Sequence, residues 1–245
     1  MMKSAKRPEI QKGKSVKQIE ARELLNLMKS QLTVRNFKIN PVSNQKLNKI
    51  LEAARWAPSA ANSQPWDLIV VRDSKTKEKI ADIILQSKRL AKEKDKKFPY
   101  GNIEALVRRF CDPPILIAVC ADTRLMEAYP KFGFREQNYS VSIGAAIQNM
   151  MLMAKALGLA LSWGTPDKLN MEKLRDLLDA PPHIRVVEIL QLGYPVKIGS
   201  PGHRRQTREF VHAGKFDGSK SRSNKEIEIL LSTRKAGDIY SGSPK

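Results

Sequence analysis

The hydrophobic residues of this chain recur at two spacings, one typical of helices and the other of buried strands. Isoleucine and leucine return every three or four positions from Val16 to about residue 31, which predicts an amphipathic helix. Ser43 is a suitable N-cap for a second helix, which we expect to end at Ala57-Pro58. The segment 33–37 between the two helices is expected to be extended.

Two further segments are expected to form the centre of the fold. Ile115–Cys120 is an unbroken apolar run between turn residues, which is typical of a strand covered on both faces. Residues 140–157 form the strongest helical pattern, with Lys155 as the only charge, and Gly158 stands where helices commonly end. A helix that is apolar on nearly all sides belongs in a core or in an interface between subunits.

The remaining elements are shorter. We expect further helices that start at Asp73-Ser74 and cover Lys168–Leu178 and Ile227–Leu231, and strands at Leu68–Val71, Leu159–Trp163 and Val186–Leu192. Helices therefore alternate with strands, and this order predicts a layered α/β or α+β domain. The length of 245 residues is enough for such a domain to bury a proper core.

Composition narrows the class of protein. No run approaches the roughly 18 uncharged apolar residues that a membrane-spanning helix needs. The basic residues at the N-terminus are followed by no apolar stretch, so we expect no signal peptide. Two cysteines, Cys111 and Cys120, are too few for a disulfide scaffold. Together these observations favour a cytoplasmic protein.

The net charge of +19 is concentrated in three stretches. Residues 1–17, 75–97 and 197–222 each carry a net +5, and residues 1–15 are expected to be a basic arm. A basic surface attracts nucleic acid, anionic lipid or acidic proteins whatever their sequence. Lysine-rich surfaces also keep proteins in solution without any binding role. The charge by itself therefore names no function, and no recognisable nucleic-acid module accompanies it.

The sequence offers no side chain that is arranged for catalysis. It has no G-x-G-x-x-G motif after a strand, no P-loop, no H-E-x-x-H and no G-x-S-x-G. His183, His203 and His212 are scattered, which fits surface or capping positions better than a metal site or an acid–base pair. Cys120 lies in the expected buried strand, so we expect an inert core thiol.

One loop stands out for its polar content. Pro58 and Pro65 bracket a segment between a helix and a strand that contains two hydroxyls and two amides, those of Ser59, Ser63, Asn62 and Gln64. Hydroxyls and amides both donate and accept hydrogen bonds, which suits a ribityl chain or the edge of a pyrimidine. A well-capped surface loop has the same composition, so composition leaves both interpretations open.

At this loop the sequence resembles the nitroreductase superfamily of FMN flavoproteins. Residues 51–66 and the strand after them are similar to that family's helix, polar loop and strand. Three further segments follow in the same order as in the family. Residues 33–37 are similar to its N-terminal arginine motif, and residues 144–159 are similar to its long central helix. Residues 192–195, with Arg204-Arg205, are similar to its closing strand and basic tail. The similarity covers about residues 20–212.

The resemblance implies an α+β fold of three layers, in which helices flank a mixed or antiparallel sheet of four or five strands. It implies a homodimer with one FMN at each of two subunit interfaces. The FMN-binding domain would span residues 16–215, and residues 216–245 would be a C-terminal extension. The implied activity is a ping-pong reaction, in which NADH or NADPH reduces FMN and a nitroaromatic, quinone or similar electron-poor small molecule takes the electrons. Because the flavin carries the chemistry, the lack of catalytic side chains agrees with this family.

The resemblance also assigns flavin-binding roles to individual residues. Arg35 matches a cation near flavin N1 and O2, where a positive charge stabilises the reduced ring, and Thr33 matches a hydroxyl at the phosphate. Arg204 and Arg205 match a phosphate clamp, which suits the planar fork of arginine. The family's loop at the ribityl chain and ring is matched by Ser59, Ala60, Asn62 and Gln64. Its turn whose backbone amide faces flavin N5 is matched by Trp163, Gly164 and Thr165. Ser59 and Ala60 would reach the flavin of the partner subunit.

Two departures from the family pattern bear on this site. Gln31 and Leu32 stand where the family often has arginines, so part of its phosphate-binding charge is missing. Pro166 follows the turn and has no N–H to offer to N5. The lysine-rich stretch 75–97 lies where substrate-covering helices often occur in the family, and it would suit anionic acceptors.

Some interpretations stay open at this point. Arg204 and Arg205 also fit plain surface charge, and Trp163 also fits a core or interface aromatic. Arg108 and Arg109 are not counted among the binding residues, although either could add a cation near the pyrimidine. The alternative function is a binding protein on a flavoprotein scaffold, whose basic surface takes nucleic acid or an acidic electron carrier.

Overall fold

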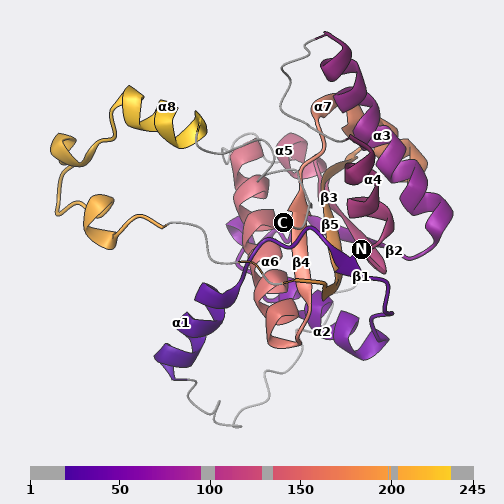
Figure 1. Cartoon of the computed structure of the whole chain (residues 1–245), viewed down its shortest axis with the longest axis horizontal. Coiled ribbons are helices and arrows are strands. Elements are labelled where there is room, and N and C mark those ends of the chain that lie inside the picture. The colour runs from indigo at the N-terminus through magenta and orange to yellow at the C-terminus, as the bar shows by residue number, and fades with distance from the viewer. Residues whose placement is uncertain (1–19, 95–102, 129–134, 198, 200–203, 233–245) are drawn as a thin grey trace.

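An antiparallel sheet of five strands lies between two layers of helices in the computed structural model (Figure 1), which describes residues 20–94, 103–128, 135–197, 199 and 204–232. The strands are β1 (Phe37–Lys38), β2 (Trp66–Val71), β3 (Ile115–Asp122), β4 (Ala160–Gly164) and β5 (Ile184–Pro195). The helices are α1 (Ala21–Ser30), α2 (Asn44–Arg55), α3 (Ser74–Lys94), α4 (Ile103–Cys111), α5 (Arg124–Ala128), α6 (Glu136–Ala156), α7 (Lys168–Leu177) and α8 (Asn224–Ser232).

The long strand β5 organises the sheet. Leu192 of β5 pairs with Ile115 of β3 on one side and with Leu161 of β4 on the other. β1 pairs with the end of β5, and β2 pairs with the far edge of β3. Every pairing is antiparallel, which settles the choice between a mixed and an antiparallel sheet.

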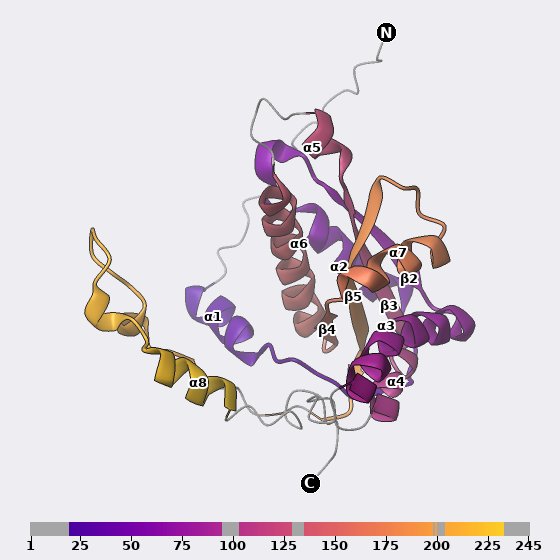
Figure 2. The same ribbon diagram turned by 90° about the horizontal axis from the view of Figure 1, so that it is seen from above.

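Alternate residues of β3 supply the two halves of the core. Ile115, Ile117 and Val119 pack with α2 and α6, whereas Leu116 and Ala118 pack with α3, α4 and α7. The view from above shows these two groups of helices on opposite sides of the sheet (Figure 2). The predicted strand covered on both faces, and with it the three-layer α+β arrangement, is therefore confirmed.

The predicted helix ends rest on local hydrogen bonds. Ser43 caps α2, because its Oγ accepts from the backbone N of Lys46 at 3.3 Å. Gly158 has a φ of 73° just after α6, a left-handed conformation that glycine adopts without steric cost. On α6 itself Ile147 and Met150 are fully buried. The helix expected to be central to the core has that position.

The structure corrects the sequence prediction in several places. α4 and α5 were not expected, α6 begins four residues before the predicted start, and β5 extends beyond both ends of the predicted strand. The segment 33–37, which was expected to be extended and not assigned to a strand, leads into the two-residue strand β1 at Phe37. The predicted helix start near Val16 and the basic arm at residues 1–15 lie outside the described residues.

A buried lysine ties α3 to the end of α4. Lys77 is 7% exposed, and its Nζ donates to the carbonyl oxygens of Cys111 at 2.9 Å and Pro113 at 2.8 Å. We expect Lys77→Met to lower the free energy of unfolding by about 2 kcal/mol, since both carbonyls would lose their charged donor. Urea unfolding measures this, with Lys75→Met on the exposed face of α3 as the matched control. Equal stability of the two variants would contradict the role of Lys77.

Candidate functional site

Five of the residues predicted to bind FMN line one cavity. The cavity has a volume of about 310 Å³ and lies at the end of β4, between the segment before β1 and the helices α3 and α4. It contains the predicted residues Thr33, Arg35, Trp163, Gly164 and Thr165. The same wall adds Lys88 and Arg109, which were not among the predicted binding residues, together with the apolar side chains of Ile84, Leu85, Leu106 and Phe110.

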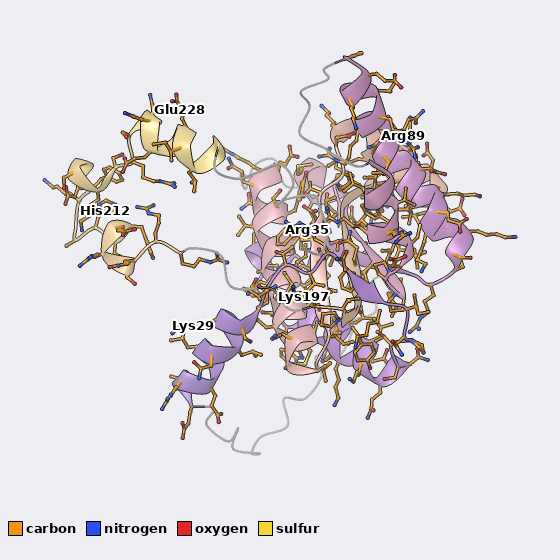
Figure 3. All side chains as sticks on the ribbon, viewed as in Figure 1. Lys29, Arg35, Arg89, Lys197, His212 and Glu228 are labelled. Atoms are coloured by element: carbon orange, nitrogen blue, oxygen red, sulfur yellow. The ribbon has the colours of Figure 1, made fainter. Side chains whose placement is uncertain are left out.

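Alternation along residues 33–37 directs two side chains into this cavity. Val34 and Phe37 are buried and pack together with Ala160 of β4. In extended backbone successive side chains point to opposite sides, and Thr33 and Arg35 line the cavity while Val34 does not. Arg35 is half-buried, with its Nε enclosed, and in Figure 3 it lies over the body of the protein. The packing of Val34 thus holds Arg35 in place.

The departures at Gln31 and Leu32 have a structural counterpart. These two residues line a separate small cavity with Val34, Met151 and Lys155, next to α6 and β4. They are not among the residues that line the 310 Å³ cavity. Besides Arg35, the cations of that cavity come from α3 and α4, as Lys88 and Arg109.

The electrostatic character of the cavity follows from its lining. The described residues of its lining include three cations, Arg35, Lys88 and Arg109, and no carboxylate. Three like charges from three segments attract an anion. The apolar side chains beside them suit a planar, uncharged body. The donor set therefore fits a ligand that joins an aromatic ring system to a phosphate.

The turn at the end of β4 is held close to β5. Gly164 pairs with Ile189, and a Cβ on this glycine would lie 3.1 Å from Gln191 Nε2 and 3.2 Å from the Ile189 oxygen. Behind the turn, Thr165 Oγ1 donates to Glu188 Oε1 at 3.1 Å. Since Pro166 has no N–H, the amides of the turn that can face a ligand are those of Gly164 and Thr165.

The polar loop lies elsewhere in the subunit. Ser59, Ala60, Asn62 and Gln64 are not among the residues that line the 310 Å³ cavity. The backbone N of Ala60 donates to Ser142 Oγ of α6 at 3.2 Å, and the backbone N of Gln64 donates to Ser59 Oγ at 3.0 Å. Ala61, Asn62 and Gln64 have positive φ values of 52°, 51° and 46°. Such strained backbone persists only where surrounding contacts impose it, and it is common in binding loops.

The predicted phosphate clamp is not assembled within one chain. Arg205 donates to the backbone oxygen of Glu209 and lies 5.8 Å from the centre of the Phe210 ring. It lines a different cavity, formed by the C-terminal segment itself, and Arg204 is exposed. That segment, residues 204–232, stands apart from the sheet in both ribbon views, and His212 and Glu228 mark it in Figure 3.

Two negative findings concern the described residues. They contain no group of three or more histidine, cysteine, aspartate or glutamate side chains that could hold a metal ion. None of their helices is long and apolar enough to cross a membrane.

For Cys120, burial raises the pKa to about 12, in keeping with the predicted inert thiol.

Comparison with known proteins gives consistent matches. Residues 28–194 match the sequence model of the Nitroreductase family. A candidate NADH dehydrogenase/NAD(P)H nitroreductase from Methanothermobacter thermautotrophicus is 33% identical over 184 residues, which are 74% of this chain and 81% of that protein. Iodotyrosine deiodinase 1 of Rattus norvegicus is 26% identical over 202 residues, 79% of this chain and 70% of that protein.

Solved structures agree with these matches. A candidate nitroreductase from Desulfovibrio desulfuricans, crystallised in complex with FMN, is 25% identical with a TM-score of 0.59, over 79% of this chain and 98% of that one. Nitroreductase A from Vibrio parahaemolyticus has a TM-score of 0.66 at 17% identity, over 90% of this chain and 86% of that one, and so shares the fold.

Proposed function

The chain belongs to the Nitroreductase family, and on this premise we propose that it is an FMN-dependent oxidoreductase that uses NADH or NADPH. We further propose a ping-pong reaction, in which a nitroaromatic, quinone or similar electron-poor molecule takes the electrons. The supporting observation is the convergence of three cations, the hydroxyl of Thr33 and the 163–165 turn on one partly apolar cavity.

When bound, FMN would supply the electron-transfer chemistry. The residues of this chain would bind and orient it. Arg35 would hold a positive charge against the pyrimidine edge, where negative charge develops. Thr33 and a neighbouring cation would bind the phosphate, because hydroxyl and cationic donors together suit its oxygens. The amides of Gly164 and Thr165 are the donors available to the ring at this turn.

We propose that the site is completed by a second copy of the chain. Several apolar side chains have no cover in the single subunit, and 73% of Val141 on α6 and 72% of Phe216 in the C-terminal segment are exposed. Exposed apolar surface of this kind is typical of an interface. The strained loop with Ser59 and Ala60 also lies away from the cavity of its own subunit, which is the arrangement expected if it serves the partner's flavin.

Reconstitution with FMN tests the enzymatic proposal. Purified protein is incubated with FMN, freed of unbound flavin by gel filtration, and examined for flavin absorption before and after anaerobic addition of NADH or NADPH. We expect retained flavin that is bleached by at least one of the two nicotinamides, and restored by addition of a quinone or nitroaromatic. A colourless protein after reconstitution would refute the proposal.

Sedimentation analysis tests the dimer. We expect the unchanged protein to sediment as a dimer, and Val141→Arg to raise the dimer dissociation constant at least tenfold, because a charge would be buried without a partner. Ile39→Arg, at an apolar residue just after β1 that is 83% exposed, is the matched control. A monomeric unchanged protein, or equal weakening by both variants, would contradict an interface at α6.

A further inference from the structure

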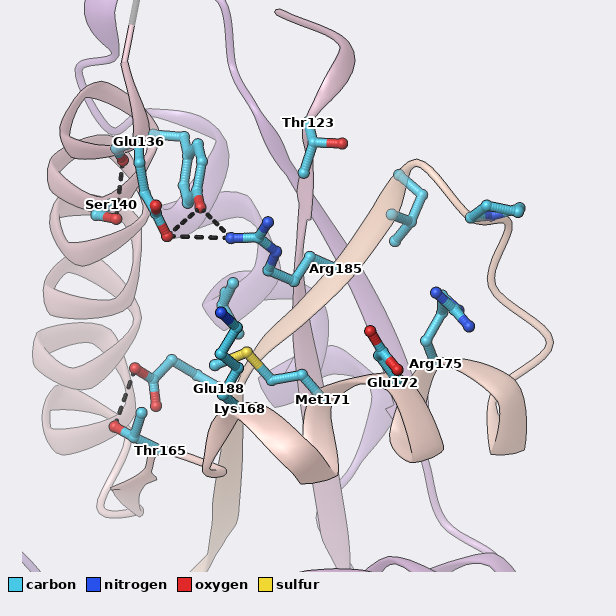
Figure 4. A pocket seen from close by; sticks show the side chains of 14 residues that line it. Thr123, Glu136, Ser140, Thr165, Lys168, Met171, Glu172, Arg175, Arg185 and Glu188 are labelled. Carbon is cyan, nitrogen blue, oxygen red and sulfur yellow. Dashed lines mark hydrogen bonds and ion pairs between the residues drawn. The ribbon is translucent and has the colours of Figure 1, made fainter. Parts of the chain in front are cut away.

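A carboxylate lies behind the turn that lines the candidate flavin cavity. Glu188, on β5, accepts a hydrogen bond from Thr165 Oγ1 at 3.1 Å (Figure 4). The side chain of Trp163 also interacts with this carboxylate and lowers its pKa. Glu188 therefore fixes the residues on both sides of Gly164, and both of them belong to the wall of the cavity.

The same carboxylate is poorly compensated on its other oxygen. Glu188 Oε2 is buried and has no hydrogen-bond partner among the described residues. Burial raises the pKa of Glu188, and the interactions with Trp163 and Thr165 oppose that change. A half-buried carboxylate with one enclosed, unsatisfied oxygen can be relieved by a proton, so the charge of this group is sensitive to its surroundings.

No cation among the described residues forms an ion pair with Glu188. Its side chain faces a second cavity of about 560 Å³ beyond the turn. There Arg185 donates to Glu136 Oε1 at 3.0 Å and to the Tyr139 hydroxyl at 2.8 Å, so it is engaged elsewhere. The titratable groups that face this cavity come from α6, α7 and β5: Glu136, Tyr139, Lys168, Glu172, Arg175, Arg185 and Glu188.

We propose that Glu188 is a positioning residue for the flavin. It orients the flavin through Trp163 and Thr165, and its own charge controls how readily the flavin accepts electrons. This inference rests on the proposed function. A negative charge directly behind the turn opposes the addition of electrons to a group in front of it, whereas the protonated carboxyl does not. Both forms still offer an oxygen that accepts from the turn.

The first test needs no flavin. The chain has three tryptophans, so Trp56→Phe with Trp66→Phe leaves Trp163 as the only indole. In this protein without FMN we expect Trp163 fluorescence to change with pH around a midpoint above 4.5, the ordinary glutamate value. Glu188→Gln should abolish the transition. Glu172→Gln, a carboxylate variant in the same cavity but away from the turn, should retain it.

The second test uses the FMN-loaded protein. Glu188→Gln keeps an acceptor for the turn, so we expect FMN affinity within about threefold of the unchanged protein, whereas Glu188→Leu should lose about tenfold. Above the Trp163 transition, the midpoint potential of bound FMN should be more positive in Glu188→Gln than in the unchanged protein. Below the transition the two potentials should coincide, and Glu172→Gln should match the unchanged protein at every pH.

The outcomes separate the two proposals. If the unchanged protein binds no FMN, the proposed function fails. If Trp163 shows no transition that depends on Glu188, or if the potentials of the unchanged protein and Glu188→Gln coincide at all pH values, the role of Glu188 is overturned. Thermal unfolding of each variant verifies the fold, and Glu188→Gln carries the test should Glu188→Leu not fold.

Discussion

Replacing Arg35 by glutamine is expected to weaken FMN binding about a hundredfold. Arg35 is the cation that the 33–37 segment contributes to the cavity. A charge-assisted hydrogen bond contributes about 1.5–3 kcal/mol, and a hundredfold change in dissociation constant corresponds to about 2.7 kcal/mol. Quenching of flavin fluorescence on titration measures the affinity directly.

Two further variants separate the contribution of the Arg35 contact from that of the overall positive charge. Arg35→Lys keeps the charge but not the planar fork, so we expect it to recover only part of the affinity. Arg22→Gln removes a cation from the exposed surface of α1 and should leave the affinity within about twofold, which separates a local contact from the overall positive field. Equal losses in Arg35→Gln and Arg22→Gln would show that Arg35 does not contact the flavin.

The central elements of the fold were predictable because each has a clear hydrophobic pattern in its own sequence. Ile115–Cys120 is apolar at every position since both faces of β3 are covered, and this pattern does not depend on distant contacts. α4 was not predictable in the same way. Its buried residues include Leu106 and Phe110, which stand beside two arginines, and Leu106 is buried by contact with Leu85 of α3.

In the candidate site too, some residues could be predicted from local sequence and others only from the packed structure. Thr33 and Arg35 follow from an extended segment whose neighbours are buried, so their common direction could be predicted from local sequence. Lys88 and Arg109 reach the cavity only because α3 packs on α4, which no short pattern reports. Glu188 could not be found from sequence, since a glutamate in a strand indicates an exposed face until the β4 turn is seen to cover it.

The roles of the polar loop and of Arg204 and Arg205 stay predictions. Neither group joins the cavity of its own subunit, and both lie on parts of the chain that carry uncovered apolar or strained features. A site shared by two subunits cannot be read from one copy, because the residues that complete it are brought in by symmetry. The dimer experiment therefore also tests these residue assignments.

The second large effect is expected at Gly164. A Cβ at this position would stand 3.1 Å from Gln191 Nε2 and 3.2 Å from the backbone oxygen of Ile189, and Gln191 is itself buried and donates to that oxygen at 3.2 Å. Alanine would require a shift of a few tenths of an ångström. Valine adds two methyl groups to a space that has no room, so the turn must move away from β5 and into the cavity.

We therefore expect Gly164→Val to weaken FMN binding a hundredfold or more, and Gly164→Ala to weaken it severalfold. Binding titrations measure both, and circular dichroism with thermal unfolding separates loss of the site from loss of the fold. A graded loss of affinity in variants that remain folded is the expected pattern, because overpacking displaces the turn by an amount that grows with the side chain. Unchanged affinity in a folded Gly164→Val protein would mean that the flavin does not lie against this turn.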